Sequence, residues 1–211
     1  NNILITGGTG FVGSHMIDYI LKHANDKIYV IKRWMEDTSN VDHIDDERLE
    51  FIDADLLDAL SIKRAIQISK PDKIFHFAAQ SFPGLSFHLP AMTIQTNTVG
   101  TTHLLECVKE SDYNPIIVSV STSEVYGMPK EDEVPIKETN PLRAANPYSI
   151  SKVGHDLMSQ YYCKAYGLKI ITTRMFSHEG ARRGKEFALS SFAHQIAKGE
   201  KSGVYTIKHG N

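Results

Sequence analysis

A tyrosine and a lysine lie four positions apart in the stretch PYSISK, as Tyr148 and Lys152. Pro147 suits the first turn of a helix, and residues four apart on a helix share a face. A free phenol has a pKa near 10, so poising it near neutral pH requires about 4 kcal/mol. One cation at ~4 Å supplies up to about 4 kcal/mol at an effective dielectric near 20. The pair therefore predicts a base that takes a proton from a hydroxyl as hydride leaves the same carbon; the alternative is a surface pair without a role.

A second group of reactive side chains follows the apolar run PIIVSV, in the order Ser121, Thr122, Ser123 and Glu124. In open α/β sheets, ligands bind at the carboxyl ends of the strands. Glu124 lies two residues past Thr122, so in an extended chain both side chains face the same way. A carboxylate there can accept a proton and return it across the same face of a substrate. The alternative is a surface acid.

The stretch TGGTGFVG follows the apolar run 2–6 and opens a helix-like segment, with glycines at 7, 10 and 13. This arrangement lets backbone amides approach a pyrophosphate at a helix N-terminus, so it predicts a dinucleotide site. A plain glycine-rich turn is the alternative. The residues expected at the dinucleotide here are Gly7, Gly8, Thr9, Gly10, Phe11, Val12 and Gly13.

The residues after the second apolar run discriminate between cofactors. An acid there accepts hydrogen bonds from a ribose hydroxyl of NAD, whereas a cation accommodates the extra phosphate of NADP. This chain has Lys32 and Arg33 at that point. Arg33 is the stronger candidate because a guanidinium meets phosphate in a fork. The pattern favours NADP over NAD, and Asp55 and Leu56 after the third run are expected to contact adenine.

Short apolar runs alternate with helix-like stretches along the chain. Strands are expected at 2–6, 27–32, 49–54, 73–78, 115–120 and 168–174, and helices at 11–23, 58–69, 89–111 and 147–166. This alternation predicts an α/β fold, a Rossmann-like doubly wound parallel sheet. His76 falls inside a strand and is expected to be a packed, hydrogen-bonded core histidine. Residues 128–141 are expected to form a surface loop.

The composition is that of an ordinary soluble globular protein, with 41% hydrophobic and 23% charged residues among 211. A net charge of −2 gives no reason to expect nucleic acid or an anionic membrane as partner. No apolar run approaches the ~20 residues of a membrane span. Two cysteines and no visible signal peptide favour the cytoplasm. Ten histidines without paired spacing predict no metal site.

Taken together, these motifs resemble the extended short-chain dehydrogenases/reductases that act on nucleotide sugars. The resemblance rests on the glycine pattern, the set Thr122, Tyr148 and Lys152, and HFAAQS at 76–81. AAQSFPGLSF (78–87), STSEVYG (121–127) and SHEGARRG (177–184) are most similar to GDP-mannose 4,6-dehydratases and their GDP-heptose relatives. Those relatives are longer, so the resemblance implies a Rossmann domain at 1–174 and an incomplete sugar-nucleotide region at 175–211.

The resemblance implies a role for each reactive residue. Thr122 would bind the sugar C4 hydroxyl, Tyr148 would deprotonate it, and NADP⁺ would take the C4 hydride. Lys152 would lower the tyrosine pKa and hold the nicotinamide ribose. Glu124 would remove the C5 proton as the C6 hydroxyl leaves as water, and the hydride would return to C6. The product would be a 4-keto-6-deoxy sugar, with no net change of redox state.

The same resemblance implies further contacts and an assembly. The remaining cofactor contacts would be Ala78, Ala79, Gln80, Ser81, Lys152, His178 and Arg183. The substrate contacts would be Ser81, Ser86, Thr122, Ser123 and Ser177. Helices 89–111 and 147–166 would pair across a homodimer, and 182–184 would lie in a segment bridging a homotetramer. Two alternatives remain: a C4 epimerase or 4-keto reductase with the same Tyr148 and Lys152, and a non-catalytic NADP-binding scaffold.

Overall fold

Six short apolar strands form one parallel sheet in the computed structural model, which describes residues 1–209. They are β1 (Asn2–Thr6), β2 (Lys27–Lys32), β3 (Leu49–Asp53), β4 (Lys73–His76), β5 (Ile116–Thr122) and β6 (Lys169–Met175). Their order is β3-β2-β1-β4-β5-β6, with every neighbouring pair parallel. This order places the reversal of direction between β1 and β4, where doubly wound sheets bind their ligands. The predicted Rossmann-like fold is confirmed.

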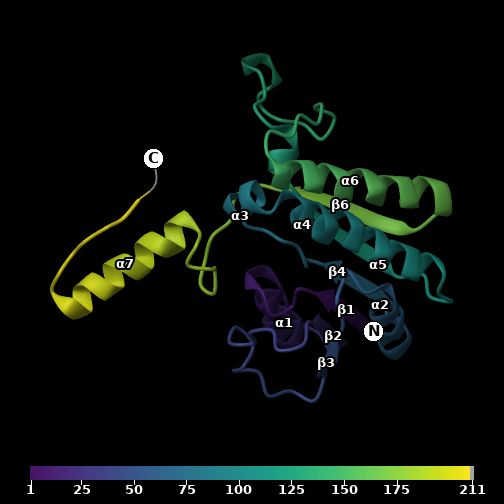
Figure 1. Cartoon of the computed structure of the whole chain (residues 1–211). Helices are drawn as coiled ribbons and strands as arrows, with labels where there is room; N and C mark the ends of the chain where they lie inside the picture. Colours follow the sequence, from purple (N-terminus) through teal and green to yellow (C-terminus); the bar gives the residue numbers. More distant parts are fainter. Residues whose placement is uncertain (210–211) are drawn as a thin grey trace. The chain divides into compact units, whose positions relative to one another are not determined.

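Helices cover the sheet on both faces because its strands are apolar on both faces. On one face lie α2 (Ala59–Ser69), α5 (Gly100–Lys109) and α6 (Pro147–Tyr166), and on the other lies α1 (Phe11–His23) (Figure 1). Alternate residues of β1 belong to two separate hydrophobic clusters, one on each face of the sheet. Leu4 packs with Ile62 and Leu104 in one cluster, whereas its neighbours Ile3 and Ile5 pack with Ile17 in the other. Each fully buried side chain of this size stabilises the fold by roughly 1.5–3 kcal/mol.

The segment expected to be one helix at 89–111 is divided. It comprises α4 (Pro90–Ile94), the π-helical turn η1 (Gln95–Val99) and α5. A short helix that the sequence did not predict, α3 (Pro83–His88), precedes it. Within η1 the Asn97 side chain bonds both the N–H and the C=O of Gln80 and the hydroxyl of Ser151. The widened turn thus ties the chain after β4 to α6.

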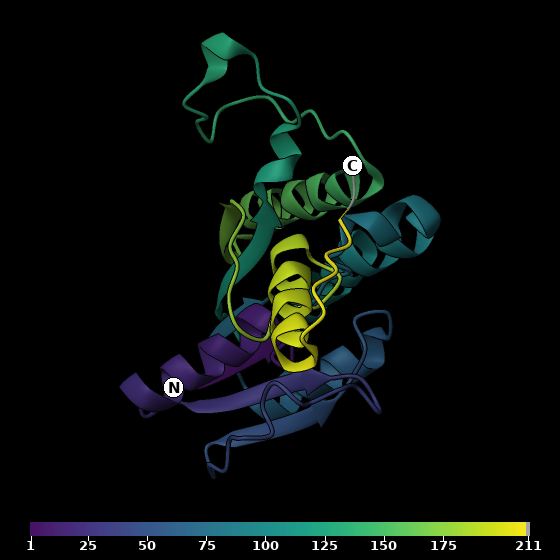
Figure 2. The ribbon, with the colours of Figure 1, turned by 90° about the vertical axis from the view of Figure 1, so that its left-hand side faces the viewer.

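A long exposed loop, residues 127–146, separates the short 3-10 turn η2 (Ser123–Tyr126) from α6 and projects beyond that helix (Figure 2). Its base is closed by the Arg143 N–H, which donates to the Val125 carbonyl at 2.8 Å. Gly127 has φ +62°, and a Cβ there would lie 1.9 Å from the Arg143 carbonyl oxygen. Only glycine fits that closure. The predicted surface loop is confirmed, and it contains one further 3-10 turn, η3 (Glu131–Glu133).

The chain divides into two compact units, the first being Asn1–Phe176 and the second beginning at Ser177. The second unit contains α7 (Ala188–Ser202), a helix that the sequence did not predict. Gly203 ends α7 at φ +72°, and the Gln195 side chain bonds the backbone of Lys208 from both its oxygen and its nitrogen. Among residues 1–209 no helix is long and apolar enough to cross a membrane.

Candidate active site

Tyr148 and Lys152 lie in the first two turns of α6, and both side chains are buried. The Lys152 ammonium donates to the Val120 carbonyl near the end of β5, at 2.7 Å. Burial lowers the pKa of Lys152 and the Asp156 carboxylate opposes that shift, which leaves the pKa at about 8. The lysine therefore remains a cation at neutral pH, as the predicted activation of a phenol requires.

Thr122 and Glu124 are brought together by a turn and not, as the sequence suggested, by an extended strand. Thr122 is the last residue of β5, and its hydroxyl caps η2 by accepting from the Glu124 N–H at 3.3 Å. The extended-chain argument for their shared face was wrong, because the chain turns at Ser123. The Glu124 carboxylate accepts from the Asn146 side-chain amide at 3.0 Å. Sequence reasoning did not identify Asn146, although an asparagine before Pro147 is a recognisable N-cap.

A chain of buried hydroxyls and imidazoles lies beside Lys152. His76 bonds the hydroxyls of Thr6 and Thr101, and His155 bonds the hydroxyls of Thr101 and Ser119. The two rings are parallel within 4°, with centroids 5.4 Å apart. Burial, together with the Lys152 charge, lowers the pKa of His76 to about 3 and that of His155 well below its usual range. His76 is thus a hydrogen-bonded core histidine, as predicted.

A buried ion pair one turn after Lys152 connects α6 to β6. Arg174 of β6 bonds the Asp156 carboxylate of α6 through two nitrogens, at 2.8 and 3.1 Å. The same guanidinium donates to the Tyr126 hydroxyl of η2 at 2.9 Å. Asp156 is fully buried, and this contact raises the pKa of Arg174 above its ordinary value. One cation therefore fixes β6, η2 and α6 relative to one another.

The glycine-rich stretch runs from β1 into the first turn of α1. Gly7 has φ +70°, and a Cβ there would lie 2.7 Å from the Ala78 backbone nitrogen. A Cβ on Gly13 would lie 2.2 Å from the Gly7 carbonyl oxygen. These close approaches keep the turn tight and place the amides of residues 8–12 at the N-terminus of α1. A backbone cradle of this kind fits a pyrophosphate.

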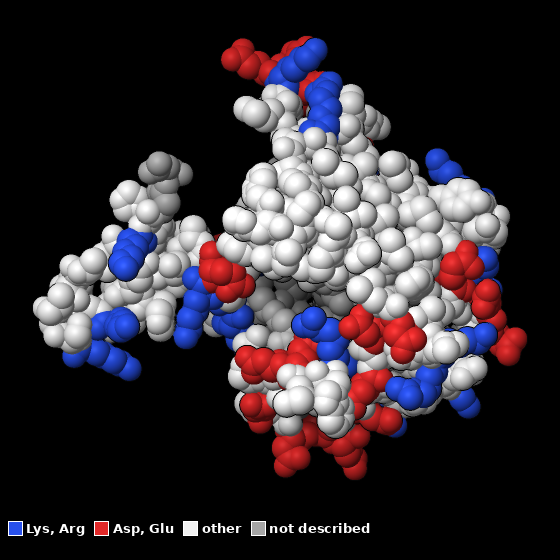
Figure 3. Space-filling model, viewed as in Figure 1, with Lys and Arg blue, Asp and Glu red and all other residues white. Residues whose placement is uncertain are grey.

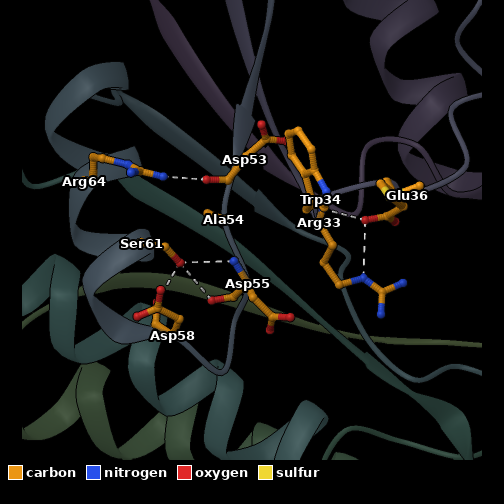
Figure 4. Close-up of a pocket in the computed structure, with 10 residues that line it drawn as sticks. Arg33, Trp34, Glu36, Asp53, Ala54, Asp55, Asp58, Ser61 and Arg64 are labelled. Carbon is orange, nitrogen blue, oxygen red and sulfur yellow. Dashed lines mark hydrogen bonds and ion pairs between the residues drawn. The ribbon is translucent and has the colours of Figure 1, made fainter.

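A pocket of about 520 Å³ opens beyond the ends of β2 and β3. It brings the predicted Arg33 and Asp55 together, with Arg64 of α2 as a further cation that sequence reasoning missed (Figure 4). Glu36 also lines it and accepts from the Thr9 hydroxyl at 2.9 Å and from the Arg33 N–H at 2.8 Å. An acid is therefore present at this pocket, four residues past the strand end, where the sequence suggested none. Trp34, which is 78% exposed, supplies an aromatic wall.

Other predicted contacts already have partners within the fold. Leu56 is buried in the core cluster, so its side chain packs away from solvent. The Gln80 amide bonds the backbone of Phe82 and the Thr93 hydroxyl, which braces the segment after β4. The buried Ser86 hydroxyl donates to the Pro83 carbonyl at 2.6 Å. Ala78, Ala79, Ser81 and Ser123 stay predictions, as do Ser177, His178 and Arg183, which lie in the second unit.

Residues 4–211 match the family model described as GDP-mannose 4,6 dehydratase. The chain belongs to this family. It is 32% identical over 204 residues to the GDP-mannose 4,6-dehydratase of Yersinia enterocolitica, and this alignment covers 92% of this chain and 54% of the relative. It is 33% identical over 181 residues to the UDP-glucose 4-epimerase of Streptococcus mutans, and this alignment covers 85% of this chain and 53% of the relative. The predicted nucleotide-sugar branch of the extended short-chain dehydrogenases/reductases is confirmed.

A solved structure agrees with the observed fold. A dTDP-glucose 4,6-dehydratase from Streptomyces venezuelae, solved with NAD bound, superimposes with a TM-score of 0.86 at 32% sequence identity. The match covers 93% of this chain and 62% of that one. The chain spans about half the length of the curated relatives it matches.

Proposed function

We propose that the protein is a nucleotide-sugar 4,6-dehydratase, acting on GDP-mannose or GDP-manno-heptose. The observation that carries this proposal is the position of the Glu124 carboxylate. It lies in η2, two residues past Thr122, and accepts a hydrogen bond from Asn146, the residue before Pro147 of α6. Moving hydride from C4 to a nicotinamide dinucleotide needs only the tyrosine and the lysine as protein groups, whereas removing water needs a further acid–base group. Glu124 supplies that group at the same end of the sheet.

Each residue then has a defined role in the reaction. Thr122 binds the C4 hydroxyl, and Tyr148 removes its proton as a phenolate that the Lys152 cation stabilises beforehand. The C4 ketone acidifies the C5 proton, which Glu124 accepts. Glu124 then donates a proton to the departing C6 oxygen, which leaves as water. A bound nicotinamide dinucleotide would supply the hydride acceptor at C4 and the hydride donor at C6. C5 takes up a proton from solvent as hydride reaches C6, and Tyr148 releases its own proton to solvent, so the product is a 4-keto-6-deoxy sugar.

The cofactor belongs to the same proposal. The cradle around Gly7 and Gly13 fits a pyrophosphate, and the pocket lined by Arg33 and Arg64 fits the adenosine end. We propose NADP in preference to NAD, because two guanidiniums border this pocket and can meet a 2′-phosphate. NAD is the alternative, favoured by Glu36 and by the NAD in the solved dehydratase.

A homodimer or homotetramer is also part of the proposal. Along α6, Ile150, Leu157 and Tyr161 lie on one face and are each about half exposed. Ile94 and Val99 add exposed apolar area on the neighbouring helical segment. Figure 3 shows a broad surface over α4, α5 and α6 that carries few charged side chains in this view. Such a face suits contact with a second copy.

One experiment separates the candidate functions. The full-length protein is incubated with NADP⁺ and GDP-mannose, and the product is analysed by mass. Loss of one water supports the dehydratase. An unchanged mass with inverted C4 supports an epimerase, a second candidate favoured by the similarity to UDP-glucose 4-epimerase. Absence of turnover with several nucleotide sugars would favour a scaffold and contradict the proposal.

A further inference from the structure

We propose that Asn146 is a positioning residue that holds the Glu124 carboxylate for water elimination and couples it to the helix carrying Tyr148. This inference rests on the proposed dehydration. It goes beyond the proposed mechanism by assigning a second residue to the elimination half of the reaction.

The backbone at Glu124 is fixed, whereas its side chain needs a partner. Val125 and Tyr126, the next two residues of η2, are almost fully buried, and Arg174 bonds the Tyr126 hydroxyl. Glu124 itself is only partly buried, so its carboxylate has several rotamers within reach of solvent. The Asn146 amide selects the rotamer that lies 3.0 Å from its own nitrogen.

Both ends of the Asn146 amide are used, which fixes its orientation. The side-chain oxygen accepts from the Ser149 N–H at 2.7 Å and so caps α6. The side-chain nitrogen therefore faces Glu124 and donates to its carboxylate. A flipped amide would place the Asn146 oxygen against a carboxylate oxygen, and neither could donate. This hydrogen bond holds the carboxylate in one orientation next to the start of α6.

The closure of the 127–146 loop makes this contact possible across 22 positions of sequence. The Arg143 N–H bond to Val125 and the glycine at 127 bring the end of the loop back to η2. Asn146 follows three residues later and begins the helix of Tyr148 and Lys152. The Asn146 side chain thus links Glu124, the proposed base for the C5 proton, to the helix that carries Tyr148, the proposed base for the C4 hydroxyl.

Two substitutions distinguish the hydrogen bond from Asn146 to Glu124 from the capping of α6 by Asn146. Serine and aspartate cap helices about as well as asparagine, so Asn146→Ser and Asn146→Asp keep an acceptor for Ser149. Serine is too short to reach Glu124, and aspartate presents a second carboxylate to it. Asn140→Asp is the matched control, because Asn140 lies in the same loop and its amide bonds the Glu133 and Lys137 backbone instead.

The expected result is measured with GDP-mannose and the full-length protein, scoring water loss and C4 oxidation separately. Asn146→Ser should slow water loss by about 10- to 100-fold, the value of a hydrogen bond to a charged group, and leave C4 oxidation unchanged. Asn146→Asp should also move the acidic limb of the water-loss pH profile to higher pH, because neighbouring carboxylates disfavour ionisation. Asn140→Asp should change neither rate.

A double-mutant cycle tests whether Asn146 acts through Glu124. In the Glu124→Gln background, Asn146→Ser should cause no further loss of elimination, and the two substitutions should shift the denaturation midpoint non-additively. Equal effects of Asn146→Ser with and without Glu124, or an additive stability cycle, would overturn the inference. A non-additive stability cycle in a protein that releases no water would instead leave the link standing and overturn the proposed dehydration.

Discussion

The Lys152 ammonium lies 2.7 Å from the carbonyl oxygen of Val120, two residues before Thr122 at the end of β5. This bond holds the charge of α6 against the strand that carries the threonine. The cation is therefore placed by the sheet, and Tyr148 is placed by the helix one turn before it. The chemistry assigned to the pair depends on that charge being present.

The pH dependence of C4 oxidation should follow Lys152. Because burial lowers the pKa of Lys152 to about 8, the cation is present below that pH and is lost above it. C4 oxidation should accordingly fall as the pH rises through about 8. Asp156, His155 and His76 surround the lysine, and the two histidines stay neutral in this range. Lys152→Met should abolish the alkaline limb along with most of the rate, whereas a variant that retains the limb would contradict this assignment.

Glu124→Gln should separate the two halves of the reaction. The amide retains the shape of the side chain and loses the base, so water loss should fall by roughly 10²- to 10⁴-fold. C4 oxidation should persist. Reduced cofactor should therefore accumulate, which the absorbance of the reduced nicotinamide measures. Glu131→Gln, in the exposed turn η3, is the matched control and should behave as wild type. Dehydration by Glu124→Gln at the wild-type rate would show that another residue acts on C5.

Arg33→Ala should weaken binding of NADP more than binding of NAD. A charge-assisted bond to the 2′-phosphate accounts for roughly 10- to 100-fold in affinity, and NAD has no such phosphate. Titration of both cofactors into the wild type and the variant measures the difference directly. Glu36→Gln is the informative companion, because it should impair NAD binding if that carboxylate holds a ribose. Equal affinities of the wild type for the two cofactors would exclude the NADP preference.

Leu157→Glu should convert the assembled protein to monomer. Leu157 lies at the middle of the exposed apolar face of α6, where a buried carboxylate would lack a partner. Light scattering at micromolar concentration gives the mass. Leu60→Glu provides the control, because Leu60 is 79% exposed on α2 and outside that face. A monomeric wild type, or a dimer that survives Leu157→Glu, would rule out this interface.

The sequence predicted those parts of the molecule that local pattern determines. The apolar runs located all six strands to within two residues, and Pro147 located the start of α6. The contact between Glu124 and Asn146 was not predictable, because it depends on how a 20-residue loop closes. Glu36 was missed for a similar reason. It reaches the pocket only because Met35 turns the chain back with φ +56° after β2.

The two stacked histidines beside Lys152 make the fold sensitive to acid. In the unfolded chain each imidazole binds a proton below about pH 6.5, whereas burial lowers the pKa of His76 to about 3 in the fold. The stability that this residue contributes is therefore present above about pH 6.5 and is lost as the pH falls toward 3. His76 alone contributes a slope of about 1.4 kcal/mol per pH unit across that window. Because His155 lies in α6, acidification should release α6 from the sheet when the fold opens.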